Sequence, residues 1–90
     1  MNKAQLIEKL SLKTQLSKHQ SEFVLDAAIE IIQKAVAKGD EVKLVGFGTF
    51  SRTHRKARKG RNPKTGEVIE IPGMKIPRFK PGKEFRDTLN

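Results

Sequence analysis

The stretch from Ser51 to Lys75 most constrains the fold, because it has almost nothing with which to build a core. Its twenty-five residues include only five apolar side chains, at positions 57, 68, 69, 71 and 74. Turn-forming residues are concentrated near its middle, at Gly60, Asn62, Pro63 and Gly66. A two-stranded ribbon is marginally stable in water by itself. The sequence therefore predicts a β-hairpin that projects from the rest of the protein as a mobile arm.

Positive charge is concentrated in the same region. The chain has 19 Lys and Arg against 10 Asp and Glu, a formal net charge of +9. Residues 1–41 carry six bases and six acids, so the whole excess lies in residues 42–90. Residues 52–64 contain no acid and seven bases: Arg52, Arg55, Lys56, Arg58, Lys59, Arg61 and Lys64. Such a run is typical either of a solvated loop or of a nucleic-acid contact, and composition alone does not decide between them.

The first forty residues show the pattern of two helices. Asn2 with Gln5, and Ser17 with Gln20, are each a cap residue followed three positions later by an amide that can reach back to it. Apolar residues recur at helical spacing from position 23 to position 36, and Gly39 is placed to end that helix in a left-handed cap.

The second predicted helix is a scaffold and not a DNA-reading helix. A recognition helix needs basic and amide side chains on its outer face, whereas this one carries Glu22, Asp26 and Glu30 there. Its broad apolar face needs cover from more than one side.

From Glu41 onward, the apolar residues recur with the spacing that is typical of β-strands. Residues 42–45 lead into Gly46 and Gly48, which allow a tight bend between two strands. The chain returns through residues 68–71 and 76–79, where Pro72 and Pro77 restrict the return strand to an edge or to bulges. A last short helix is predicted to open at Pro81 and Gly82, with Phe85 and Leu89 one turn apart.

Side-chain alternation along the first arm strand places four polar residues on one face of the ribbon. They are Arg52, His54, Lys56 and Arg58.

Size points to self-association. Without the arm, about sixty-five residues remain to bury the apolar faces of the helices and strands, which is close to the size at which folding needs a partner. We therefore expect an obligate homodimer, and two-fold symmetry would present two basic arms from one body.

Other classes of function find little support. The chain has no Cys, and His19 and His54 stand alone, so we expect no metal, no cofactor and no catalysis. Gly46 and Gly48 begin a dinucleotide-binding pattern, but Ser51 occupies the position of its third glycine. No apolar run has the length of a membrane span, and no signal-peptide pattern begins the chain, so a cytoplasmic protein with no membrane partner is expected.

Three segments resemble the bacterial histone-like HU and integration host factor family: LVGFGTF at 44–50, GRNPKTGE at 60–67 and FKPGKEF at 79–85. The resemblance covers all 90 residues. It implies an α+β fold in an intertwined homodimer, with an N-terminal helical hairpin, a three-stranded antiparallel sheet bearing a long protruding β-arm, and a short C-terminal helix. HU is itself among the proteins that define minor-groove architectural binding, so that mechanism comes with the resemblance.

The resemblance also implies roles for individual residues. Pro63, flanked by Arg61, Asn62 and Lys64, stands where the family intercalates a proline. Arg55, Arg58 and Arg61 match arm residues that line the groove, with His54 beside them. The remaining expected DNA contacts lie along the arm and on the body under bent flanking DNA: Arg52, Lys56, Lys59 and Lys75, and Lys3, Lys18, Lys80, Gly82 and Lys83.

The resulting prediction is one DNA-binding domain over 1–90. Its parts are a helical dimerisation body at 1–40, a sheet at 41–50 and 76–80, a DNA-binding arm at 51–75 and a C-terminal helix at 81–90. The expected function is to bind the minor groove of double-stranded DNA with little sequence specificity, to bend it and to organise the bacterial nucleoid. Bent, nicked or kinked DNA should be favoured. A sequence-preferring bender like integration host factor and, less favoured, an RNA-binding protein remain open alternatives.

Overall fold

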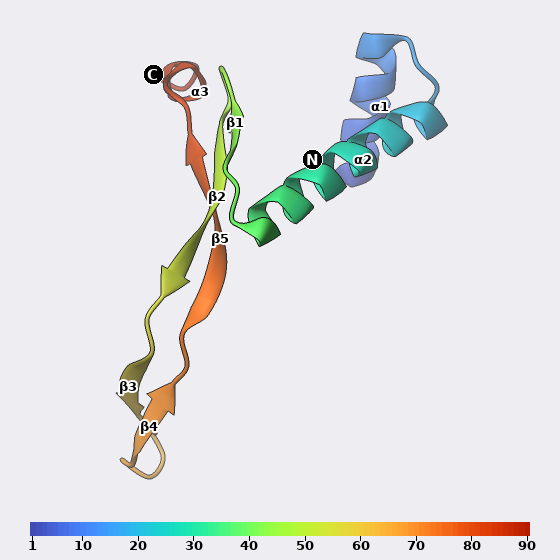
Figure 1. Cartoon of the computed structure of the whole chain (residues 1–90). Helices are drawn as coiled ribbons and strands as arrows, with labels where there is room; N and C mark the ends of the chain where they lie inside the picture. The colour runs from blue at the N-terminus through green and yellow to red at the C-terminus, as the bar shows by residue number, and fades with distance from the viewer. The chain divides into compact units, whose positions relative to one another are not determined.

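A computed structural model describes all residues, 1–90, and has an α+β fold of three helices and five strands (Figure 1). The chain divides into two compact units, residues 1–34 and 35–90. The elements are α1 (Lys3–Thr14), α2 (Lys18–Lys38), β1 (Val42–Leu44), β2 (Gly48–Arg55), β3 (Arg58–Arg61), β4 (Val68–Ile71), β5 (Met74–Pro81) and α3 (Lys83–Asp87). The predicted helical hairpin, sheet, arm and terminal helix are all present, so the predicted fold class is confirmed.

Both predicted N-terminal caps form in the first unit. The Asn2 side chain accepts from the backbone N–H of Gln5 at 2.9 Å, and the Gln5 side chain accepts from the backbone N–H of Asn2 at 3.0 Å. Ser17 and Gln20 repeat the arrangement at 3.0 and 3.2 Å. Each pair satisfies two N–H groups that a helix start leaves without an internal partner, and so fixes where the helix begins.

Gly39 ends α2 as the sequence predicts. It adopts φ +97°, in the left-handed region. Its N–H donates to Val36 O at 3.0 Å, and the N–H of Asp40 donates to Ala35 O at 3.0 Å. These two bonds form the Schellman motif, which satisfies two of the last carbonyls of a helix.

The sheet has the order β1-β2-β5 and is antiparallel throughout. Gly46, at φ +86°, turns the chain between β1 and β2, and the Phe47 N–H donates to Leu44 O at 3.0 Å. The turn brings Phe47 against Phe79 and Phe85, with ring centroids 5.1 and 5.4 Å apart, while Phe50 and Phe79 lie 4.8 Å apart. Four of the five Phe thus form one aromatic cluster that joins the sheet to α3.

Beyond Phe50, β2 and β5 continue as a two-stranded ribbon, and β3 and β4 extend it to the tip (Figure 1). The predicted arm is therefore a paired hairpin with a short interruption. Arg55 faces Met74 and Arg58 faces Ile71, so two residues on each strand separate the ladders and none is inserted as a bulge.

Proline positions explain this interruption. Along a strand, backbone N–H groups point alternately toward and away from the paired strand. Pro77 and Pro81 are four residues apart in the edge strand β5, so both occupy the positions whose N–H would point away, and neither removes a ladder hydrogen bond. Pro72 is an odd number of residues from both, at the alternate position of the β2–β5 ladder, where an N–H would be required. The β2–β5 ladder therefore has no donor with which to continue through Pro72. The expectation that the return strand lies at an edge is confirmed, whereas no bulge occurs.

The terminal helix is shorter than the predicted segment 81–90. Pro81 belongs to β5, Gly82 is the N-cap, and the helix ends at Asp87. Phe85 therefore packs in the aromatic cluster, but Leu89 lies beyond the helix and is exposed. Thr88 ends the helix by folding its hydroxyl back onto Phe85 O at 2.6 Å.

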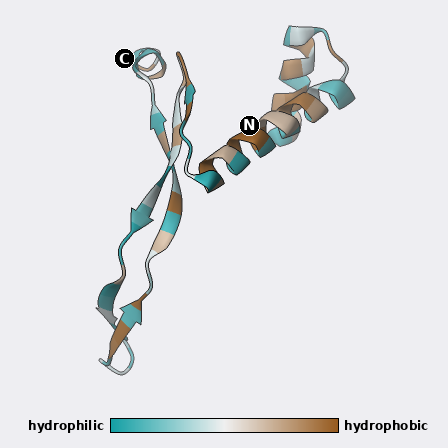
Figure 2. Cartoon of the chain, in the orientation of Figure 1, coloured by the Kyte–Doolittle hydropathy of each residue, from teal (hydrophilic) through white to brown (hydrophobic).

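The single chain buries almost none of its apolar side chains. Ile7, 8% exposed, is the only apolar side chain that is buried. Hydrophobic residues recur along α1 and α2 and in β4, whereas β3 is mainly hydrophilic (Figure 2). No helix combines the length and the apolar character needed to cross a membrane.

Candidate nucleic-acid interface

The tip of the arm is a tightly bonded loop around Pro63. Asn62 and Glu67 close it, with the Asn62 N–H donating to Glu67 O at 2.8 Å. The Gly66 N–H donates to Asn62 O at 2.8 Å, and the Lys64 N–H donates to Asn62 Oδ1 at 2.9 Å. Gly66 takes φ +73°, which a side chain would oppose. Hydrogen bonds on both sides thus hold Pro63 at the outer end of the arm with its ring exposed.

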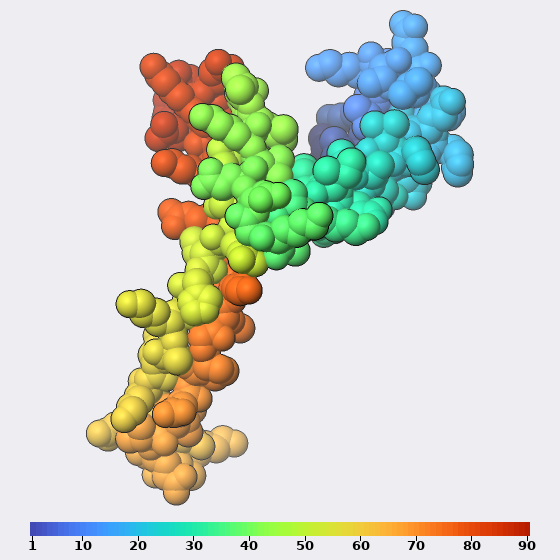
Figure 3. Space-filling view, in the orientation of Figure 1, coloured from blue at the N-terminus to red at the C-terminus, as the bar shows by residue number.

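The bases of β3 lie on both faces of the ribbon. Arg58 and Gly60 share one face with Ile71 and Ile69 of β4, and Lys59 and Arg61 share the other with Glu70 and Val68. Ile71 lies over Gly60, where an added Cβ would be 3.0 Å from its Cδ1. On the side in view in Figure 3, the yellow and orange arm is a narrow column that the rest of residues 35–90 does not cover. The arm can therefore present cations to two surfaces at once.

The predicted row of four side chains does not lie on one continuous strand. Arg52 and His54 belong to β2, Lys56 lies in the interruption, and Arg58 begins β3. The His54 ring lies beside Gly73, 3.4 Å from the position that a Cβ would take. The lapse of the ladder at Pro72 is what divides the row.

Arg52, expected to contact phosphate, is engaged within the protein. Its Nη1 donates to Ala37 O at 2.8 Å, at the end of α2. Its side chain is half-buried, whereas those of the other arm bases are exposed.

Lys3 is also engaged, in the helical unit. Its Nζ lies 2.8 Å from Asp26 Oδ1. The hydrogen bond and the charge of that carboxylate raise the pKa of Lys3 above its ordinary value. Lys3 is therefore cationic at neutral pH, but it must leave Asp26 or share it to contact a phosphate.

The remaining candidate residues differ in whether they have a donor free to contact a phosphate. Lys18 begins α2 and Lys83 begins α3, while Lys75 and Lys80 lie in β5, and all four are exposed. The Gly82 N–H donates to Phe47 O at 2.9 Å and so has no free donor for a phosphate. The DNA contact expected at Gly82 and Lys83 is therefore reduced to the Lys83 side chain and the few amides of a five-residue helix.

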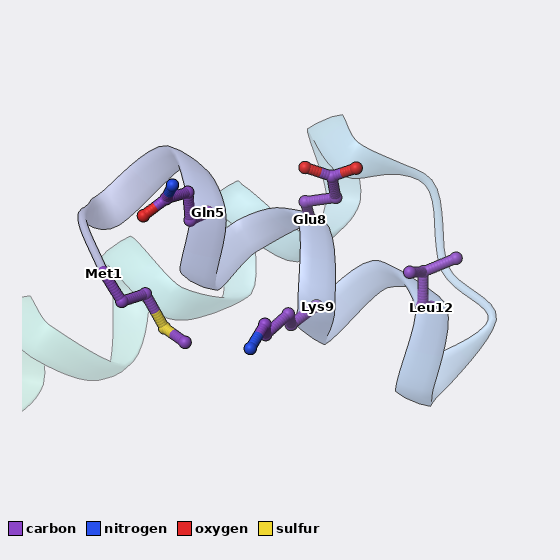
Figure 4. A pocket seen from close by; sticks show the side chains of 5 residues that line it. All are labelled: Met1, Gln5, Glu8, Lys9 and Leu12. Carbon is purple, nitrogen blue, oxygen red and sulfur yellow. The ribbon is translucent and has the colours of Figure 1, made fainter.

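An open cavity of about 480 Å³ lies on α1 and its N-terminal end. It is lined by Met1, Gln5, Glu8, Lys9 and Leu12 (Figure 4). It contains none of the candidate DNA-binding side chains.

Two contacts escaped the sequence reasoning. The Arg52 bond joins residues fifteen apart in different elements, and no local pattern signals it. The Lys3–Asp26 pair could have been suspected, because both residues flank the apolar faces of two helices expected to pack together.

These elements define a small, basic α+β protein with a dense run of cations on a protruding β-arm. Known proteins share these features. The family described as "Bacterial DNA-binding protein" matches residues 1–90. DNA-binding protein HU of Clostridium pasteurianum is 52% identical over 90 residues, covering 100% of this chain and 99% of the relative. HU of a Nostoc species is 51% identical over 89 residues, covering 99% and 95%.

Solved structures agree with the sequence comparison. A chain of an Anabaena HU–DNA cocrystal structure has a TM-score of 0.92 and 49% identity, and the match covers 99% of this chain and 97% of that one. HU from Thermotoga maritima has a TM-score of 0.71 and 30% identity, with full coverage of both chains. The chain therefore belongs to the HU family of bacterial DNA-binding proteins.

Proposed function

We propose that this protein is a histone-like architectural factor that binds duplex DNA in the minor groove, with little sequence specificity, and bends it. The observation that carries the proposal is Pro63, exposed at the outer end of an arm that has seven bases and no acid in residues 52–64. The similarity to a chain crystallised with DNA supports it. The minor groove offers a degenerate hydrogen-bond code, so selectivity would come from deformability or from kinks already present.

The two faces of the arm suit a groove with two walls. Arg58 faces one way, and Lys59 and Arg61 face the other, so both phosphate backbones come within reach of cations. Such contacts supply sequence-independent affinity. Pro63, at the tip, would enter between base pairs and unstack a step, the wedge mechanism already associated with HU and its relatives. Arg55, Lys56, Lys64, His54 and Lys75 would extend the contact along the arm.

The functional unit is a homodimer. The chain exposes 7944 Å², whereas a folded monomer of 10.1 kDa exposes about 5,300 Å². The projecting arm accounts for part of this excess, and exposed apolar side chains on α2 and in the aromatic cluster account for more. An excess of this size is comparable to the surface that obligate dimers bury. Residues 1–40 and the sheet would form the shared body, and two arms would embrace one duplex.

Dimers of this kind would compact and organise the bacterial nucleoid. Bent flanking DNA would follow the body over Lys18, Lys80 and Lys83, and over Lys3 once its pairing with Asp26 yields. Each added phosphate contact offsets part of the bending cost.

Competition between nucleic acids tests the proposal. We expect a duplex with a central nick to bind at least about tenfold more tightly than an intact duplex, because the nick removes much of the cost of bending. A structured RNA of equal length should bind more weakly than either, since its deep, narrow major groove and shallow minor groove suit the arm poorly. The readout is displacement of a labelled duplex at fixed salt. Tightest binding of the RNA would overturn the proposal.

Salt dependence tests the arm cations. Arg58→Ala and Arg61→Ala should each flatten the plot of log K against log salt by about 1.8, because each contact contributes about 0.9 and a dimer has two arms. Lys9→Ala, on α1 and outside the candidate interface, is the matched control and should leave the slope unchanged. Equal slopes in all the variants would show that the arm arginines stay solvated.

A further inference from the structure

At its root the arm makes a contact with the end of α2, through Arg52, that the basic run in the sequence does not reveal. β1 pairs with β2 only as far as Phe50, so the sheet narrows to two strands immediately before Arg52. Arg52 faces Pro77 across this ribbon. At this point the arm has no lateral support from β1, so a contact with another element can set its direction.

Arg52 bonds to one of the carbonyls at the end of α2 that the Schellman motif does not use. The Schellman motif at Gly39 uses the carbonyls of Ala35 and Val36. The carbonyl of Ala37, next in the chain, accepts from Arg52 Nη1 at 2.8 Å. A cation at this position also meets the negative end of the helix dipole.

Gly39 makes room for the guanidinium. A Cβ on Gly39 would lie 3.0 Å from Nη2 and 3.4 Å from Cζ of Arg52, so the planar group rests against the bare Cα. The same residue supplies the left-handed turn that ends α2. The helix end is thus shaped to receive an arginine, and the half-buried Arg52 side chain fills it.

We propose that Arg52 is a positioning residue that locks the root of the β-arm to the C-terminus of α2, and that it is not one of the phosphate contacts. The inference deepens the proposed function, since it says how the arm is aimed at DNA. Positive charge in the run from residue 52 to residue 64 then has two roles: Arg52 orients the arm, and the bases beyond it contact the nucleic acid.

The first test needs no DNA. Arg52→Met keeps the aliphatic stem and removes the donors, so hydrogen exchange at the Gly39 and Asp40 amides should become about three- to tenfold faster. Arg52→Lys, which keeps one donor and the charge, should restore part of the protection. Unchanged exchange in Arg52→Met would overturn the anchoring.

The second test separates positioning from phosphate contact. With Arg52→Met the salt slope should equal that of the wild type, while the DNA bend measured by end-to-end energy transfer becomes smaller or broader. A slope lower by about 1.8 with an unchanged bend would instead make Arg52 a phosphate contact of both arms. A variant that alters neither quantity would also overturn the proposal. If the wild type itself fails to bend DNA, the proposed function fails, and the exchange experiment still decides the role of Arg52.

Discussion

Phe47→Ala should destabilise the folded protein by about 3–5 kcal/mol per chain, the usual cost of removing a buried Phe, and so by about 6–10 kcal/mol per dimer. Phe47 contacts Phe79 and Phe85 and lies 6.2 Å from Phe50, centroid to centroid. In the single chain, however, it is 43% exposed. The full cost therefore arises only if a second chain covers the cluster.

Urea unfolding at two protein concentrations measures both parts of this prediction. Because unfolding of a dimer releases two chains, tenfold dilution should lower the apparent stability of the wild type by about 1.4 kcal/mol per dimer. Leu12→Ala is the control, since Leu12 is 75% exposed; it should change stability by less than about 0.5 kcal/mol. A midpoint independent of concentration, together with a small effect of Phe47→Ala, would mean that the chain folds alone.

Local features of the fold could be predicted from the sequence because each depends on residues a few positions apart. The caps at Asn2 and Ser17 and the left-handed end at Gly39 have all their determinants within one helical turn. The bend around Gly46 is equally local. Such elements keep their structure whatever the distant chain does, which is why their boundaries could be placed closely.

Features that depend on strand register could not be predicted. Pro72 interrupts the ladder and Pro77 does not, although both are prolines in a return strand. The difference lies in which of two alternating positions each occupies, and the sequence does not reveal this parity before the pairing is known. For the same reason, only the pairing of β3 with β4 shows that Arg58 lies on one face of the ribbon and that Lys59 and Arg61 lie on the other.

The candidate site shows the same limit in its chemistry. The sequence locates a run of bases, but it cannot tell a cation free to meet DNA from one already engaged. Arg52 donates to Ala37, and Lys3 pairs with Asp26. The N–H of Gly82 is likewise used by Phe47 O. These partners are supplied by other elements, so the charge pattern of the sequence overestimates the number of groups that are free to contact DNA.

Pro63→Ala should reduce the DNA bend by tens of degrees while preserving most of the affinity. An apolar wedge produces a kink of about 20–90° at the step it enters, and the methyl group of Ala is too short to fill that gap. No charge is lost, so the salt slope should stay at the wild-type value. The measurement is energy transfer between dyes on the two ends of a duplex, with binding isotherms at several salt concentrations.

Pro63→Leu separates the wedge from an ordinary turn proline. Both substitutions remove the ring that fixes φ at the tip, so a turn role predicts the same bend from both variants, whether or not it is reduced. A wedge role predicts that Leu retains most of it, because Leu is among the side chains that unstack base steps. The Asn62 side chain bonded to the Lys64 amide, and Gly66 bonded to Asn62, should keep the loop closed in both variants, since neither bond involves the proline. An unchanged bend in Pro63→Ala, or an equal loss in both variants, would return Pro63 to the role of a turn residue.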